Sequence, residues 1–159
     1  MRQGRHRPHH CQDKPMKRLP SIKTVMTPFP YSVDADASVD EASEFMREHH
    51  IRHLPVTDDG QLVGIISDRD IKLMLGPDFA YPDSKALKVR EAMVRDAYIV
   101  DLDSRLDVVL SHMADHHLGS VVVTRKGKLA GMFTVTDACR SFAEFLREQV
   151  RRSGGGDAA

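Results

Sequence analysis

The chain has 159 residues and contains an internal repeat, which limits its possible folds more than any other feature. Residues 25–71 align with residues 92–138 without a gap, at a constant offset of 67 positions, and fifteen of the forty-seven aligned pairs are identical. Many of the other pairs exchange similar residues, such as Ser67 with Thr134. Because the same order of apolar and polar positions is given twice, we expect two halves of similar structure.

Each half holds about 50 to 60 residues, near the lower limit for a domain that is stable alone. Two such halves gain stability by sharing an interface, so we expect them to pack against each other. Because the repeat is ungapped, we expect a pseudo-twofold axis between the halves and equivalent clefts where they meet.

The apolar pattern of each half predicts the element order β-α-β-β-α, and therefore an α+β fold. A short β-prone segment precedes a helix, a turn with glycine joins two strands into a hairpin, and a second helix follows. We expect the first helices to begin after the capping residues Ser38 and Ser104. The β-prone segment, hairpin and final helix are predicted at residues 31–33, 54–67 and 71–75 in the first copy, and at 98–100, 121–134 and 138–150 in the second.

Polar, basic and proline-rich stretches divide the chain into segments. The N-terminal tail has almost no apolar residues, and the C-terminal tail is rich in glycine, so neither is expected to join a core. The predicted boundaries are 1–18 for a disordered tail, 19–76 for the first repeat, 77–86 for a linker, 87–150 for the second repeat with its long helix, and 151–159 for a second disordered tail.

The same motif ends the hairpin in both copies, at residues 64–70 and 131–137: a glycine, two apolar residues, a hydroxyl residue and, three positions later, an aspartate. It delivers a hydroxyl, free N–H groups and a carboxylate to a helix N-terminus, which favours anions. The hydroxyl and N–H groups suit a phosphate, and the carboxylate, which only accepts hydrogen bonds at neutral pH, suits ribose hydroxyls. The same pattern is also that of a helix cap without any ligand. The residues alone leave both interpretations open.

Taken together, these patterns resemble the cystathionine β-synthase (CBS) domain family over about residues 20–145. The resemblance implies tandem CBS repeats with pseudo-twofold symmetry, forming a stand-alone pair called a Bateman module. It also implies that an adenosine-containing ligand (AMP, ADP, ATP, S-adenosylmethionine or an NAD-type dinucleotide) binds in the clefts as a regulatory ligand, with no cofactor required. The motifs that carry it are residues 25–28, 51–56 and 59–70 in the first copy, and 92–94 and 131–137 in the second.

The resemblance also assigns residues to two clefts, each of which draws on both repeats. In each cleft the aspartate that closes the motif holds the ribose, and the hydroxyl residue and the residue before the aspartate contact phosphate. We expect the Asp137 cleft to hold a charged phosphate chain better, because Arg52 and His53 line it, whereas the second copy has Gly119 and Ser120 at those positions. The Asp137 cleft comprises Thr27, Tyr31, Ser32, Ile51, Arg52, His53, Thr134, Thr136 and Asp137, and the Asp70 cleft comprises Ser67, Arg69, Asp70, Val94, Tyr98, Ile99, Gly119 and Ser120.

The charge balance and the cysteine count limit the partners and the compartment. Lys+Arg and Asp+Glu both number 23, so no net charge attracts nucleic acid or an anionic membrane. No segment approaches the roughly 20 apolar residues of a membrane span. Cys11 and Cys139 are too few for a disulfide framework. We therefore predict a cytoplasmic protein without nucleic-acid or membrane partners.

Catalysis and metal binding have little support in the sequence. No serine, cysteine or lysine is placed with a base and an orienting acid, so we predict that the chain is not an enzyme. Two groups of possible metal ligands lack a complete set, so we predict no metal site. They are His6, His9, His10 and Cys11 in the tail, and the pair His112 and His116.

Two functions therefore stay open for this chain. The first is a ligand sensor that signals to a separate, unknown effector protein. The second is a dimerising interaction module whose clefts are empty or vestigial. In both, the apolar stripe of residues 138–150 offers a surface for a homodimer, which is the usual assembly of the family that the chain resembles.

Overall fold

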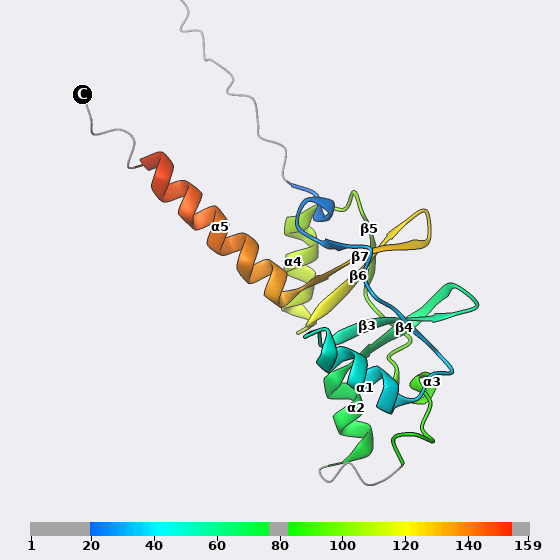
Figure 1. Cartoon of the computed structure of the whole chain (residues 1–159). Helices are drawn as coiled ribbons and strands as arrows, with labels where there is room; N and C mark the ends of the chain where they lie inside the picture. Colours follow the sequence, from blue (N-terminus) through cyan, green and yellow to red (C-terminus); the bar gives the residue numbers. More distant parts are fainter. Residues whose placement is uncertain (1–19, 77–82, 154–159) are drawn as a thin grey trace, which may run out of the picture.

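The computed structural model describes residues 20–76 and 83–153, which form two β-sheets with helices packed on them (Figure 1). The α+β class, both hairpins and the order of the elements in each repeat are as predicted. The first repeat contains η1 (Ile22–Thr24), β1 (Thr27–Pro28), β2 (Val33–Asp34), α1 (Val39–Glu48), β3 (His53–Asp58), β4 (Gln61–Ser67) and α2 (Asp68–Leu75), and the second contains α3 (Val89–Ala92), β5 (Ile99–Asp101), α4 (Leu106–Asp115), β6 (Ser120–Arg125), β7 (Lys128–Thr134) and α5 (Val135–Ser153).

Each repeat supplies most of one sheet and most of one core. The first sheet has the strand order β2-β3-β4, the second has the order β1-β7-β6-β5, and the two sheets meet where β4 contacts β7. In the first core, Met46 of α1 packs with Leu54 of β3. In the second core, Met113 of α4 packs with Phe133 of β7. The apolar positions of each helix recur every three or four residues, which places them on the face toward the sheet.

The first segment of each repeat, residues 20–28 and 87–95, crosses onto the other repeat. Ile22 is fully buried in the second core, and its counterpart Val89 is fully buried in the first. The N–H of Ile22 donates to the carbonyl oxygen of Ser104, and the N–H of Val89 donates to that of Ala37, both at 2.9 Å. The predicted boundaries at 19–76 and 87–150 therefore follow the sequence repeat, but the first residues of each repeat complete the core of the other.

The crossing segments continue onto the edge of the opposite sheet. β1 pairs antiparallel with β7, with Thr27 opposite Met132, and Val94 forms the equivalent bridge opposite Ile65. Val94 comes 67 positions after Thr27, and Met132 comes 67 positions after Ile65. The two contacts are therefore equivalent in the two repeats, as a pseudo-twofold axis requires. This confirms the predicted symmetry of the two halves.

The crossing needs a glycine in each copy of the motif. A Cβ atom on Gly64 would lie 2.7 Å from the carbonyl oxygen of Val94, and one on Gly131 would lie 2.5 Å from Sδ of Met26 and 3.0 Å from the carbonyl oxygen of Thr27. Distances this short are not compatible with a side chain unless the neighbour moves. The glycine of each motif thus serves the contact between the repeats.

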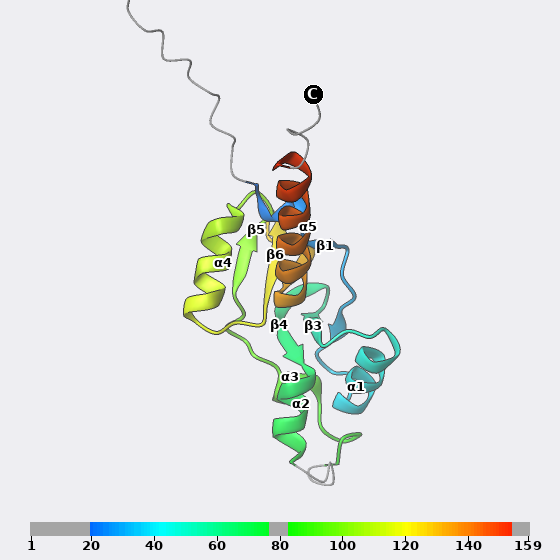
Figure 2. The same ribbon diagram turned by 90° about the vertical axis from the view of Figure 1, so that its left-hand side faces the viewer.

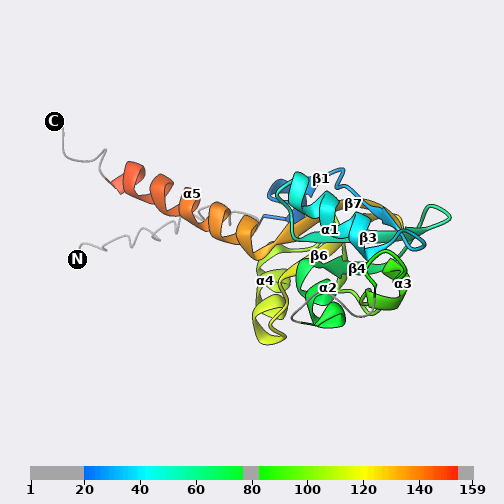
Figure 3. The same ribbon diagram turned by 60° about the horizontal axis from the view of Figure 1, so that its bottom comes forward.

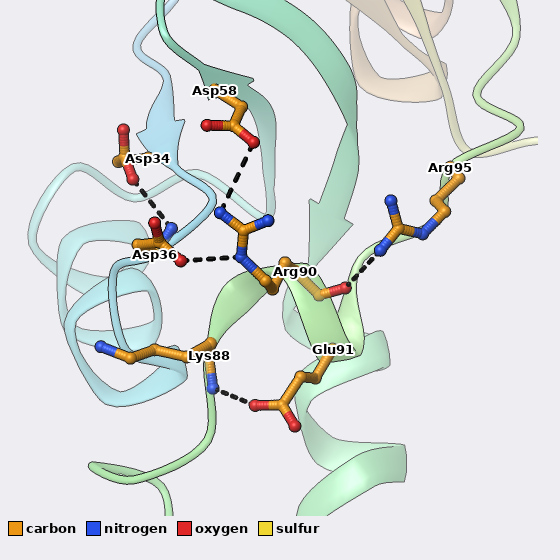
Figure 4. Close-up of polar contacts among 7 residues, drawn as sticks. All are labelled: Asp34, Asp36, Asp58, Lys88, Arg90, Glu91 and Arg95. Atoms are coloured by element: carbon orange, nitrogen blue, oxygen red, sulfur yellow. Dashed lines mark hydrogen bonds and ion pairs between the residues drawn. The ribbon is translucent and has the colours of Figure 1, made fainter.

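Ion pairs at the surface link each crossing segment to the repeat that it crosses onto. Arg90 donates from Nε to Oδ1 of Asp36 at 2.7 Å and from Nη2 to Oδ2 of Asp58 at 3.5 Å (Figure 4). The hydrogen bond from Arg90 lowers the pKa of the Asp36 carboxyl. The counterpart of the Arg90–Asp36 pair is the ion pair of Lys23 with Asp103.

The helix α5 has 19 residues, and most of its length extends beyond the sheets, as Figures 1 and 3 show. Figure 2, turned by 90°, shows its first turns passing in front of the second sheet. The large apolar side chains Phe142, Phe145 and Leu146 are exposed on it, with 61%, 52% and 48% of their surface accessible. The predicted stripe is therefore present. Its first residue, Ala138, packs against the second core, and the large side chains that follow are exposed.

Two predictions about helix ends were wrong. Ser38 caps α1 through a capping box with Glu41, as predicted, but α4 begins after Arg105 and has no side-chain cap, so Ser104 is not its cap. The first N–H of α4 instead donates to the carbonyl oxygen of Pro20 in the crossing segment, at 3.0 Å. α5 continues to Ser153, so three residues of the predicted C-terminal tail are helical. The tail 1–18 and most of the linker lie outside the described residues.

Candidate functional site

A cavity of about 550 Å³ lies between the two repeats at the N-terminus of α5. This volume falls in the range of small-molecule sites. The first repeat contributes the segment after β1 and the entry to β3, and the second contributes the end of β7 and the start of α5. The lining residues are Thr27, Phe29, Pro30, Tyr31, His50, Ile51, Arg52, His53, Gly119, Met132, Thr134, Val135, Thr136, Asp137 and Arg140.

Asp137 is the most buried charged side chain of this cavity, with 12% of the side chain exposed. Its Oδ2 accepts hydrogen bonds from the N–H of Thr134 at 2.9 Å and from the Thr134 hydroxyl at 2.7 Å. The N–H of Asp137 donates to Oγ1 of Thr134 at 3.3 Å, which completes a capping box at the start of α5. The cap thus occupies one carboxylate oxygen and leaves Oδ1 for other partners.

In this structure Oδ1 of Asp137 is paired with an arginine from the next turn of α5. Nη1 of Arg140 donates to it at 2.9 Å, while 64% of the Arg140 side chain stays exposed. An ion pair this open to water contributes little to stability. Arg140 therefore brings a second guanidinium to the cavity, close to the carboxylate, without being fixed there by burial.

Arg52 and His53 enter the cavity at the start of β3. Arg52 is exposed, whereas His53 is half-buried, and a Cβ atom on Gly119 would lie 3.4 Å from its Nε2. Burial lowers the pKa of His53 below its ordinary value, the nearby Asp70 carboxylate raises it, and Arg52 lowers it further. His53 is thus mostly neutral at neutral pH and lies where the two predicted clefts approach each other.

Two aromatic side chains of the first repeat also line the cavity. The ring of Tyr31 packs against Phe45 and His49 of the helix α1 region, with ring centroids 5.2 Å and 4.4 Å away. Phe29 has a φ of 48° and is 91% exposed. Their flat apolar surfaces suit contact with a planar base.

The residues around Asp70 repeat the cap of the other copy. Oδ2 of Asp70 accepts from the N–H of Ser67 at 2.9 Å and from its hydroxyl at 2.5 Å. Among the described residues, no side chain pairs with Oδ1 of Asp70. Arg69, the residue before the aspartate and so predicted to contact phosphate, is exposed on the first turn of α2.

The other residues predicted for the Asp70 cleft lie on the second sheet or its crossing segment. Val94 bridges to β4, and Ser120 pairs with Thr134 at the ends of β6 and β7. Tyr98, whose pKa is raised by burial, stacks on His112 at 4.1 Å between ring centroids. Ile99 in β5 is exposed. The assignment of these residues to one ligand site stays a prediction.

The structure brings together all the residues predicted for the Asp137 cleft except Ser32. Ser32 follows Tyr31 in an extended segment, where successive side chains point to opposite sides, and it does not line the cavity. Gly119, predicted for the Asp70 cleft, lines the Asp137 cavity because it packs against His53 at the seam. Whether these residues contact a ligand stays a prediction.

Sequence reasoning missed Phe29, His50 and Arg140 in the lining of the cavity. Arg140 comes three residues after Asp137, beyond the end of the aligned repeat, and its spacing suits a side-chain pair on one helix face. That spacing is the one signal that identifies Arg140 in advance. His50 and Phe29 adopt positive φ values of 54° and 48°, which a pattern of apolar residues does not reveal.

The possible metal ligands form no ligand set that the structure describes. His112 and His116 stack on each other with ring centroids 4.0 Å apart, and the ring Nδ1 of His116 lies 3.0 Å from the carbonyl oxygen of His112. Within residues 20–76 and 83–153, no group of three or more histidine, cysteine or acidic side chains is arranged to hold a metal ion. The group from His6 to Cys11 lies outside the described residues.

Comparison with known proteins agrees with this architecture. The sequence pattern of the CBS domain matches residues 22–76 and again residues 89–144, which together make up more than half of the chain. The chain therefore belongs to the CBS domain family, with two CBS repeats in tandem. Among curated relatives, the uncharacterized protein YlbB of Bacillus subtilis is 37% identical over 140 residues, covering 86% of this chain and 88% of that protein.

Solved structures of CBS domain pairs have the same fold. The CBS pair of protein MJ0100, in complex with 5′-methylthioadenosine and S-adenosyl-L-methionine, matches with a TM-score of 0.70 and 27% identity, covering 79% of this chain and 98% of that one. CBSX2 in complex with AMP matches with a TM-score of 0.68 and 26% identity, covering 79% and 97%.

Some curated relatives are longer proteins with enzyme names. This chain spans 25% of an L-aspartate semialdehyde sulfurtransferase and 34% of a zinc metalloprotease, both of Methanocaldococcus jannaschii. The similarity therefore covers a minor part of these enzymes. No helix in the described ranges is both long and apolar enough to cross a membrane.

Proposed function

We propose that this chain is a non-catalytic regulatory module that binds an adenosine-containing ligand between its two CBS repeats and signals to a separate protein. The observation that carries the proposal is the cavity of about 550 Å³ at Asp137, to which both repeats contribute side chains. A ligand in it contacts both halves at once, so binding favours one arrangement of the halves over others. That is the physical requirement for a sensor.

The chemistry of the lining supports an adenosine ligand. Asp137 is a buried acceptor for ribose hydroxyls, and Arg52 and Arg140 are cations for a phosphate. Phe29 and Tyr31 offer apolar rings for a base. Two similar CBS pairs are solved with AMP or with S-adenosyl-L-methionine and 5′-methylthioadenosine, which are ligands of this class.

A thermal-shift screen of the whole chain tests this proposal. The panel contains AMP, ADP, ATP, S-adenosylmethionine, 5′-methylthioadenosine and NAD⁺, with GMP and CMP as controls for the base. A ligand at 100 times its dissociation constant adds about 2.7 kcal/mol to the free energy of unfolding, which raises the melting temperature by roughly 5 to 10 °C. A flat response to the whole panel contradicts the sensor and favours the interaction module.

An apolar surface supports a second copy of this chain as one partner of the module. A groove of about 460 Å³ lies between α4 and the start of α5, and Phe142, Phe145 and Leu146 continue its apolar lining along the exposed part of α5. Exposed apolar surfaces of this extent are typical of protein interfaces. The groove is lined by Leu110, Met113, Ala114, His117, Leu118, Gly119, Val135 and Ala138.

Sedimentation measures this assembly directly. We expect a dimer at micromolar concentration, and a shift toward monomer in the variant Phe145→Glu, which places a charge in the apolar stripe. Glu144→Gln, on the neighbouring position of the same helix, is the matched control and leaves the dimer intact. A wild-type chain that sediments as a monomer contradicts the homodimer while leaving the ligand proposal in place.

A further inference from the structure

The Asp137 cleft differs from its twin in a residue that the repeat alignment does not reach. Arg140 is paired with Oδ1 of Asp137 at 2.9 Å, and the position 67 residues earlier is Leu73, which is 72% exposed on α2. The two aspartates accept the same capping hydrogen bonds at Oδ2. They differ at Oδ1, the oxygen left for a ligand, which in the part of the chain that the structure describes is paired with an arginine only in Asp137. This difference carries an inference about which ligands each cleft accepts.

The acceptor capacity of Asp137 is limited. A carboxylate has about four lone-pair sites, of which the Thr134 N–H and hydroxyl occupy two and Arg140 occupies a third. A ribose that donates both of its hydroxyls needs two sites. A ribose can therefore pair fully with Asp137 only if Arg140 gives up its hydrogen bond.

We infer that Arg140 makes the Asp137 cleft selective for adenosine ligands that carry an anionic phosphate over the neutral nucleoside. In the free protein, Arg140 donates a hydrogen bond to the carboxylate of Asp137. When a nucleotide binds, the ribose takes its place on the carboxylate, and the phosphate, attached to the same sugar, accepts the released guanidinium. A neutral nucleoside displaces Arg140 in the same way but offers it no new partner.

The exposure of Arg140 sets the size of this effect. With 64% of the side chain accessible, the released guanidinium returns to water at small cost, so a nucleoside is disfavoured but not excluded. A charge-assisted hydrogen bond to phosphate is then the main gain for the nucleotide. We expect Arg140 to contribute about tenfold to the ratio of AMP affinity to adenosine affinity.

The inference rests on the proposed function, and calorimetric titration of AMP and adenosine tests both. The titrations use the full chain in an Asp70→Asn background, so that the Asp137 cleft dominates the signal. Arg140→Leu copies the twin cleft and is expected to lower the AMP-to-adenosine affinity ratio about tenfold, mainly through weaker AMP binding. Arg140→Lys keeps the charge without the planar fork and is expected to fall between the two.

A matched gain of function uses the other cleft. In an Asp137→Asn background, Leu73→Arg is expected to raise the AMP-to-adenosine ratio at the Asp70 cleft. Thermal melting of each variant without ligand shows that it is folded, as expected because Arg140 and Leu73 are exposed and an asparagine keeps the shape of each aspartate. If the protein with the native Arg140 binds AMP but Arg140→Leu leaves the ratio unchanged, the inference is overturned and the proposed function stands. If it binds neither AMP nor adenosine, the inference is overturned. The proposed function is overturned as well only if the whole thermal-shift panel gives a flat response.

Discussion

The Asp137 cleft and the Asp70 cleft have the same backbone and different charges. In each, a strand ends in a hydroxyl residue, the aspartate is the third residue of the helix that follows, and the other repeat contributes a crossing segment. The carboxylate of Asp137 is buried and faces Arg140, whereas Asp70 is partly exposed and has Leu73 at the equivalent position. The two repeats thus share the helix cap at the aspartate and differ in the charge around it.

The walls opposite the two aspartates differ in the same direction. Arg52 and His53 stand at the entry to β3, and the equivalent positions at the entry to β6 hold Gly119 and Ser120. These differences add cations near Asp137, whereas Arg69, at the position equivalent to Thr136, adds one near Asp70. We therefore expect the two predicted clefts to differ in the charge of the ligand that each accepts.

The largest expected effect comes from removing the charge of each aspartate in turn. Asp137→Asn keeps an acceptor oxygen for the Thr134 cap but weakens two ribose hydrogen bonds, so we expect AMP affinity to fall about a hundredfold, or about 2.7 kcal/mol. We expect Asp70→Asn to change the affinity of the stronger site by less than about threefold. Calorimetric titration of the two variants measures both. If Asp70→Asn is the more damaging change, the ranking of the clefts is wrong.

The second-largest expected effect is on the free energy of unfolding, when each of the two glycines that contact the crossing segments is replaced by alanine. Gly64→Ala places a Cβ atom 2.7 Å from a backbone oxygen of Val94, so the backbone must shift, and we expect a loss of about 2 kcal/mol in the free energy of unfolding. Gly131→Ala is expected to cost about 1 kcal/mol, because the nearest atom belongs to the flexible side chain of Met26. Urea unfolding measures both. Equal losses mean that the crossings are equally tight.

The sequence predicts the fold well because the fold depends on patterns that recur. The offset of 67 positions, the period of apolar residues and the glycines of the hairpin turns are all visible in the chain, and they determine the elements and the pseudo-twofold axis. The crossing of the leading segments was not predicted. Ile22 and Val89 keep the same offset, but they lie before the aligned region, and burial in the opposite core leaves no local pattern.

The parts of the candidate site that belong to the repeated motif could be predicted from the sequence. The contacts that depend on how side chains from different elements are oriented could not. Both Ser/Thr-x-x-Asp caps form as the spacing predicts. The spacing of three residues permits the pairing of Arg140 with Asp137, but it does not say that the pair faces the cavity. Gly119 is predicted for the Asp70 cleft, whereas it packs against His53 and lines the Asp137 cavity.

The cap predicted at Ser104 rests on residue type alone, because serine is common before a helix, and α4 begins after Arg105. The structure satisfies that helix end with a backbone oxygen from the crossing segment.

A smaller effect on the free energy of unfolding is expected at the N-termini of α1 and α4, of which only α1 has a side-chain cap. Ser38→Ala removes the side chain that accepts from the N–H of Glu41, so we expect a loss of about 1 kcal/mol in the free energy of unfolding. Arg105→Ala, at the equivalent position, removes no cap and is the matched control. Urea unfolding of the two variants checks the difference. If both cost the same, the side-chain cap of α1 contributes nothing that α4 lacks.

The smallest effect is a pH dependence at the seam. Burial lowers the pKa of His53 from its ordinary value of 6.5, so the unfolded chain takes up a proton at a higher pH than the folded chain. The free energy of unfolding therefore decreases as the pH falls below about 6.5, and the loss is complete below the folded pKa. We expect His53→Gln to reduce this loss, measured by urea unfolding between about pH 7.5 and about pH 5.5. His50→Asn, a change at an exposed histidine, is the control.

The neighbours of His53 sharpen this test. The carboxylate of Asp70 raises the pKa of His53 and so opposes the effect of burial. Asp70→Asn removes that charge, so the folded pKa falls further and the loss of stability at acid pH increases. The same substitution made in His53→Gln has no such effect, because no imidazole is left to respond. If Asp70→Asn changes the pH dependence equally with and without His53, the two side chains are not coupled.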